Sequence, residues 1–123
     1  MQSILIAEDN DEDFAAFQRV FTRTNGATLI RCRDGQEAIN YLINPPDGTN
    51  SRPSMILLDL NMPGTDGRET LTRIKRDPEL RVIPAVVFST STNPKDIAYC
   101  YEHGANGYMN KPINFMDLER NLR

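Results

Sequence analysis

The chain has 123 residues, of which 39% are hydrophobic and 25% charged, and a net charge of −3. This length suits a single domain, and the negative charge gives no electrostatic support to the binding of nucleic acid or of an anionic membrane. No apolar stretch approaches the roughly 18 residues of a membrane-spanning helix, and no signal-peptide pattern opens the chain, so a cytoplasmic protein is expected.

Five short apolar runs are typical of the buried strands of a parallel sheet. In chain order they are Ile4–Ala7, Thr28–Cys32, Met55–Leu58, Ala85–Phe88 and Gly107–Met109.

Each run is followed by a segment whose apolar residues recur every three or four positions, which predicts an amphipathic helix that packs on the core. The five apolar stripes are Phe14, Phe17 and Phe21; Ala38, Ile39 and Leu42; Leu71 and Ile74; Ile97 and Tyr101; and Phe115, Leu118 and Leu122.

Turn-forming residues separate these elements where the alternation predicts it. Asn25-Gly26 and Gly104 are expected to end the first and fourth helices, whereas Asp34-Gly35, Asp66-Gly67 and Asn93-Pro94 precede the second, third and fourth. The proline-rich stretch from Asn44 to Ser54 is expected to form an extended surface loop.

Alternating strands and helices predict an α/β fold, a flavodoxin-like (βα)₅ doubly wound parallel sheet with strand order 2-1-3-4-5. In such sheets ligands bind beyond the carboxyl ends of the strands, where the first and third strands lie side by side.

Acidic residues follow those two strands. Glu8 and Asp9 come directly after the first apolar run, and Asp59 follows the third. Crowded carboxylates repel one another, and a hard divalent cation such as Mg²⁺ would relieve that repulsion. Asp11, Glu12 and Asp13 fit instead the start of a helix, where the dipole favours acidic residues.

Four segments resemble the receiver domains of two-component response regulators, at the spacing of that family and across nearly the whole chain. They are IAEDN at residues 6–10, LLDLNMPGTDG at 57–67, VVFSTS at 86–91 and GANGYMNKP at 104–112.

The resemblance implies a role for each matching residue. Asp59 would accept a phosphoryl group, as carboxylate nucleophiles do elsewhere, and Lys111 and Ser89 would contact the phosphoryl oxygens. Ser89 and Tyr108 would form a switch that responds to phosphorylation. The implied Mg²⁺ ligands are Glu8, Asp9, Asp59 and the backbone carbonyl of Asn61.

The resemblance also implies the partners. A sensor histidine kinase would donate the phosphoryl group, and the fourth helix, fifth strand and fifth helix would signal to a downstream protein or phosphotransfer protein. Residues 1–123 are interpreted as one receiver domain without an output domain, and homodimerisation is left open. The loop at 44–54 and the wording LLDLNMPG and STSTNPKD are similar to receivers that partner phytochrome-type photoreceptor kinases.

Such a receiver catalyses its own phosphotransfer and slow dephosphorylation, without multiple turnover. One alternative is a haloacid-dehalogenase-like Mg²⁺ phosphatase, but that family has a second acid where this chain has Asn61, which cannot transfer protons. The second alternative is a receiver-like adaptor that takes no phosphate. A calcium loop starting at Asp9 fails, because Phe14 and Val20 replace the glycine and glutamate that it requires.

Overall fold

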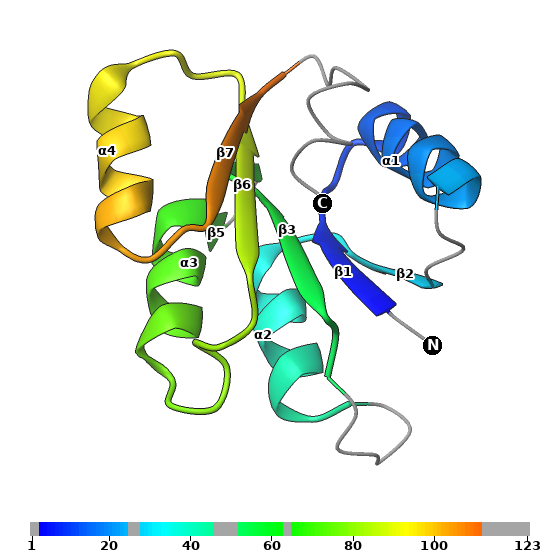
Figure 1. Cartoon of the computed structure of the whole chain (residues 1–123), viewed down its shortest axis with the longest axis horizontal. Coiled ribbons are helices and arrows are strands. Elements are labelled where there is room, and N and C mark those ends of the chain that lie inside the picture. Colours follow the sequence, from blue (N-terminus) through cyan, green and yellow to red (C-terminus); the bar gives the residue numbers. More distant parts are fainter. Residues whose placement is uncertain (1–2, 25–27, 46–51, 63–64, 112–123) are drawn as a thin grey trace.

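The computed structural model describes residues 3–24, 28–45, 52–62 and 65–111. They form a five-stranded parallel sheet flanked by helices, and a separate two-stranded sheet (Figure 1). No helix in these residues is long and apolar enough to cross a bilayer. The predicted turn at Asn25-Gly26, most of the loop from Asn44 to Ser54 and the last helical stripe, which starts at Phe115, lie outside the described residues.

The main sheet has the predicted strand order. Its strands are β1 (Ser3–Ala7), β2 (Thr28–Cys32), β3 (Met55–Asp59), β6 (Ala85–Ser89) and β7 (Gly107–Asn110). They run parallel in the order β2-β1-β3-β6-β7, which is 2-1-3-4-5 when only this sheet is counted. The carboxyl ends of β1 and β3 are therefore neighbours, with Ala7 beside Leu58.

A two-residue hairpin was not predicted. Strand β4 (Asn61–Met62) pairs antiparallel with β5 (Thr65–Asp66) directly after β3. Two residues on each side are too few to produce an apolar alternation, so the amino-acid pattern carries no signal for this hairpin.

The four helices among the described residues are α1 (Asp11–Thr24), α2 (Gly35–Ile43), α3 (Gly67–Arg76) and α4 (Pro94–Glu102). Of the predicted turn residues, Asp34 and Asn93 directly precede α2 and α4, whereas Asp66 lies in β5. The Asp34 side chain accepts a hydrogen bond from the amide of Glu37, and the Asn93 side chain accepts one from Lys95, so both residues act as N-caps. Gly104 follows α4 with a φ of +99°, a conformation that favours glycine.

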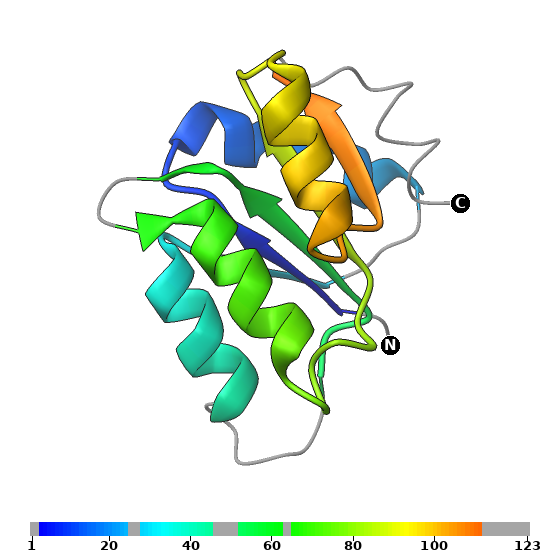
Figure 2. The same ribbon diagram turned by 90° about the vertical axis from the view of Figure 1, so that its left-hand side faces the viewer.

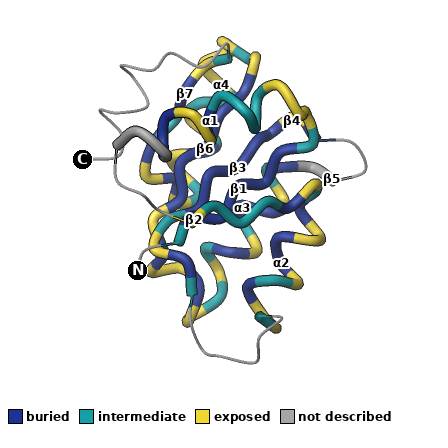
Figure 3. Tube along the Cα trace, turned by 90° about the vertical axis from the view of Figure 1, so that its right-hand side faces the viewer, coloured by how far each residue is buried: buried dark blue, intermediate teal, exposed yellow. Residues whose placement is uncertain are grey.

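The sheet separates two hydrophobic layers. Helix α1 covers one face, and α2, α3 and α4 lie on the other (Figure 2). Alternate residues of β1 point to opposite faces: Ile6 packs with Phe17 and Phe21 of α1, whereas Leu5 packs in the layer of α2 and α3. The central strands are accordingly buried on both sides (Figure 3).

The prediction that Ile97 and Tyr101 form the buried face of α4 was wrong. Tyr101 is 51% exposed, Ile97 is half-buried, and the residue that α4 buries completely is Cys100. Helix α4 contacts β7, the edge strand of the sheet, and so has little surface to cover. A small side chain can fill such a narrow contact, and cysteine behaves as a small hydrophobic residue.

Candidate metal centre

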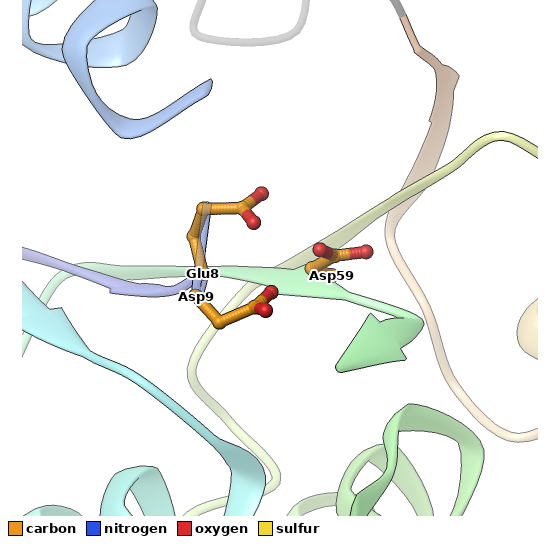
Figure 4. A group of neighbouring side chains, drawn as sticks. All are labelled: Glu8, Asp9 and Asp59. Carbon is orange, nitrogen blue, oxygen red and sulfur yellow. The ribbon is translucent and has the colours of Figure 1, made fainter. Parts of the chain in front are cut away.

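Three carboxylates meet at the carboxyl end of the sheet. Glu8 and Asp9 follow β1, and Asp59 is the last residue of β3. One oxygen from each of the three lies within 4.8 Å of the other two (Figure 4). Glu8 and Asp59 are completely buried and Asp9 is partly exposed, which leaves this group open to solvent on one side.

Neighbouring backbone fixes the position of Glu8. Its amide donates to the carbonyl of Cys32 at 2.9 Å and so extends the pairing of β1 with β2 by one residue. Its carbonyl accepts from Nε of Arg31 at 3.1 Å, and its Oε1 accepts from the amide of Asn10 at 2.9 Å. The Glu8 carboxylate is therefore held between β1 and the start of α1.

Burial raises the pKa of Glu8 to about 7, although the hydrogen bond from Asn10 acts in the opposite direction. The nearby charge of Asp59 adds to the increase. Glu8 Oε2 lies 3.2 Å from Nζ of Lys111 but has no hydrogen bond of acceptable geometry among the described residues. A buried carboxylate oxygen in this state, beside two more carboxylates, suits a divalent cation.

Lys111 places a positive charge at the same point. Its amide donates to the carbonyl of Ser89 at 2.8 Å, which continues the pairing of β6 with β7 and brings Lys111 to the site. Its Nζ lies 2.9 Å from Asp59 Oδ2 and 2.8 Å from Asp13 Oδ2. Burial alone would lower the pKa of Lys111, but hydrogen bonds to Asp13 and Asp59 outweigh it, and the pKa is raised. Lys111 is therefore an ammonium ion in this site.

The position of Asp13 at the carboxylate cluster was not predicted from the sequence. The expected acidic start of α1 is present, with Asp11, Glu12 and Asp13 in its first turn. Asp11 behaves as predicted for a surface residue and pairs with Arg31 and Arg33. The carboxylate of Asp13 instead turns toward the strand ends. Its position in the first turn of α1 could have suggested this, because that helix begins just after Glu8 and Asp9.

Asn61 and Ser89 contact each other beside Asp59. The amide of Asn61 donates to Asp59 Oδ1 at 2.8 Å, which orients the carboxylate. The hydroxyl of Ser89 donates to Asn61 Oδ1 at 2.8 Å and accepts from the amide of Ser91 at 3.0 Å. Thr90 also donates to Asn61 Oδ1, from its amide. Ser89 thus lies next to the site with its hydroxyl directed at Asn61.

Tyr108 lies one step further from the carboxylates. It is half-buried in β7, and its hydroxyl donates to the carbonyl of Ser91 at 2.9 Å. The side chain of Ser91 donates to Asp96 Oδ2 at 2.6 Å, and Asp96 pairs with Arg68 of α3. Hydrogen bonds therefore connect Ser89, through Ser91, to both Tyr108 and α4.

This arrangement defines a class of protein: a parallel α/β domain with a cluster of carboxylates and a lysine at the carboxyl ends of its strands. The family model of the response regulator receiver domain matches residues 4–123. The chain belongs to that family, whose members bind a divalent metal and act as phosphoacceptors rather than as typical enzymes.

Similar proteins of known sequence extend the comparison. The probable methanogenesis regulatory protein FilR2 of Methanothrix harundinacea is 42% identical over 97% of this chain and 77% of its own length. The response regulator Rcp1 of Synechocystis is 44% identical over 94% of this chain and 80% of its own.

Solved structures agree with the fold. The Mn²⁺-bound form of Rcp1 superposes with a TM-score of 0.85 at 41% identity, covering 98% of this chain and 88% of that one. The phosphorylated cyanobacterial phytochrome response regulator RcpA superposes with a TM-score of 0.86 at 40% identity, covering 97% of this chain and 86% of that one. The chain is thus close to phytochrome-associated response regulators.

Proposed function

We propose that this receiver takes a phosphoryl group from the phosphohistidine of a sensor kinase onto Asp59. The observation that carries the proposal is the position of Asp59, completely buried at a strand end, with Lys111 Nζ at 2.9 Å and two further carboxylates beside it. A nucleophilic carboxylate in such surroundings needs positive charge on its far side before a phosphoryl dianion can approach.

Mg²⁺ is the proposed metal, with Glu8, Asp9, Asp59 and the backbone carbonyl of Asn61 as ligands. The oxygens of the three carboxylates meet within 4.8 Å, and an all-oxygen donor set suits this hard cation. Bound Mg²⁺ would neutralise the negative charge of the acceptor and of the transferring group.

Asp59, Lys111 and Ser89 would each have a separate role in the transfer. An oxygen of Asp59 forms a bond to phosphorus while the bond between phosphorus and the donor imidazole breaks, and the leaving nitrogen keeps the electron pair. Lys111 supports the phosphoryl oxygens as a point charge. Ser89 would join it after leaving Asn61 Oδ1, and that departure would disturb the hydrogen bond between Ser89 and Ser91.

The proposed switch is this rearrangement. Tyr108 and α4 both depend on Ser91, so a movement of Ser89 would change their surroundings and alter the surface formed by α4, β7 and the segment that follows. A downstream protein or a phosphotransfer protein would read that surface. Homodimerisation and a cytoplasmic location stay predictions.

The proposed donor is a phytochrome-type histidine kinase. This finer assignment is supported by the similarity to RcpA, whose structure is described as that of a phytochrome response regulator, and to the bacteriophytochrome response regulator AtBRR at 31% identity. Nucleic acid is not a proposed partner, because the chain carries a net charge of −3.

The two alternatives have less support. A phosphatase with multiple turnover would need an acid close to Asp59, and the side chain there is Asn61, an amide held by Ser89 and Thr90. An adaptor that takes no phosphate would have no use for a lysine that pairs with a buried carboxylate at the metal cluster.

Intact mass spectrometry tests the proposed function. The protein is incubated with acetyl phosphate and Mg²⁺, and one phosphoryl group per chain is expected. Asp59→Asn or chelation of Mg²⁺ should abolish the label. Labelling that survives Asp59→Asn would contradict the assignment, and sustained release of phosphate from p-nitrophenyl phosphate would favour the phosphatase instead.

A further inference from the structure

Lys111 is held by three carboxylates that come from three different elements. Its Nζ lies 2.8 Å from Asp13 Oδ2, 2.9 Å from Asp59 Oδ2 and 3.2 Å from Glu8 Oε2. Asp13, on α1, is thus the closest of the three, and it is the one residue of this group that stands outside the proposed metal ligands. Asp13 and Asp59 are hydrogen-bonded to the ammonium, whereas Glu8 contributes only its nearby charge.

The carboxylate of Asp13 does not cap the start of α1. Asn10 precedes α1, and its Oδ1 accepts from the amide of Asp13 at 2.9 Å. In a capping box the side chain of the third helical residue, here Asp13, would accept a hydrogen bond from the amide of the N-cap residue, here Asn10. Here that amide donates to Glu8 Oε1 instead. The Asp13 side chain, 29% exposed, therefore faces Lys111, whose own side chain is only 12% exposed.

The other two partners of Lys111 change when the protein is phosphorylated. Asp59 exchanges its carboxylate for an acyl phosphate and loses its own negative charge, and Glu8 is proposed as a metal ligand. Asp13 is neither the proposed phosphoacceptor nor a proposed metal ligand, so its carboxylate stays available to Lys111. Without it, the ammonium would lose its fixed anchor just as it has to point an N–H at the phosphoryl group.

We propose that Asp13 is a positioning residue for phosphotransfer: it anchors Lys111 from α1 while Asp59 is converted to the acyl phosphate. This inference rests on the proposed function of Asp59. Asp13 acts through Lys111 and touches neither the phosphoryl group nor the metal.

The first test compares labelling rates with acetyl phosphate at saturating Mg²⁺. Asp13→Asn removes the charge with little change of shape, and we expect labelling about tenfold slower, the effect of one lost charge-assisted hydrogen bond. Asp13→Ser, a residue also favoured at helix starts, should give a similar loss. Glu12→Gln is the matched control, because it removes the same charge from the exposed neighbouring residue of the same turn, and its rate should stay within about twofold of wild type.

A double-mutant cycle separates positioning from a general structural role. In a Lys111→Ala background the Asp13→Asn change should have no further effect on labelling, because the group that Asp13 positions is gone. Binding of beryllofluoride, an analogue of the phosphoryl group, gives a readout independent of chemistry: calorimetry at saturating Mg²⁺ should show about tenfold weaker binding for Asp13→Asn.

The outcomes are distinguishable. Wild-type protein that takes no label would overturn the proposed function and this inference with it. Wild-type protein that is labelled at Asp59, with Asp13→Asn as fast as Glu12→Gln, would overturn the role of Asp13 alone. An Asp13→Asn defect of equal size with and without Lys111 would also overturn it.

Discussion

Glu8 is buried without full compensation of its charge, and this gives the metal-free protein a defined response to pH. The pKa of Glu8 is about 7 in the folded chain, mainly because of burial, against 4.5 as its ordinary value. Between these pH values the folded protein retains a proton that the unfolded chain has lost. Its free energy of unfolding should therefore fall as pH rises from 4.5 to about 7.

Urea unfolding in the presence of a chelator measures this slope. Glu8→Gln cannot titrate and should lack the part of the slope that Glu8 contributes, while excess Mg²⁺ should flatten it in the wild type by replacing the proton. Equal slopes for the wild type and Glu8→Gln without metal would show that the charge of Glu8 is satisfied by other means.

Gly67 allows α3 to begin directly against the backbone of Asp59. A Cβ at this position would lie 2.5 Å from Cα of Leu60 and 2.8 Å from the carbonyl oxygen of Asp59, both backbone atoms. Gly67→Ala should therefore displace Asp59, slow labelling by acetyl phosphate and cost about 1–3 kcal/mol in urea unfolding. Glu69→Ala, on the exposed side of the same turn, is the control and should change neither. A normally labelled, fully stable Gly67→Ala would show that the backbone can move aside freely.

At the level of single residues, the sequence located the carboxylates but missed some of their partners. Glu8, Asp9 and Asp59 were predictable because each follows an apolar run whose neighbours in the sheet follow from the strand order. Asp13 was not, because an acid in the first turn of a helix has a sufficient local explanation. The hydrogen bond from Ser89 to Asn61 depends on the relative placement of two strand ends, which spacing does not encode.

At the level of elements, α4 is tied to the rest of the domain through Asp96. This residue accepts from Ser91 and pairs with Arg68 of α3, and these hydrogen bonds lower the pKa of Asp96. Asp96→Asn should loosen the start of α4, so the backbone amides that follow Pro94 in this helix should exchange hydrogen faster than in the wild type. Lys95→Ala, on the exposed side, serves as the control. Unchanged exchange would mean that capping by Asn93 alone holds the helix.

The strands were predicted more accurately than the helices. All five predicted strands are present with ends that differ by at most one residue, since runs buried on both faces leave a clear apolar signal. The stripe of α4 failed because a helix at the sheet edge buries only Cys100, and periodicity alone could not decide which side of that helix faces β7.

At the scale of the whole molecule, the proposed phytochrome-type donor has a direct test. A phytochrome-type histidine kinase that carries labelled phosphohistidine should transfer its label to this chain faster than to an unrelated receiver. The amount of kinase that carries phosphohistidine should change when the photoreceptor is switched between its light states. Faster transfer from a histidine kinase without a photoreceptor would contradict this partner while leaving the receiver assignment unaffected.

The central claim is that one divalent cation binds between the two strand ends, beside the oxygen that accepts phosphorus. Calorimetric titration with Mg²⁺ tests it most directly, on the wild type and on Asp9→Asn and Asp59→Asn. We expect one ion per chain and at least about tenfold weaker binding in each variant, because each removes a charged oxygen ligand. Affinities equal to that of the wild type in both variants would contradict the account, since the cation would then bind elsewhere or not at all.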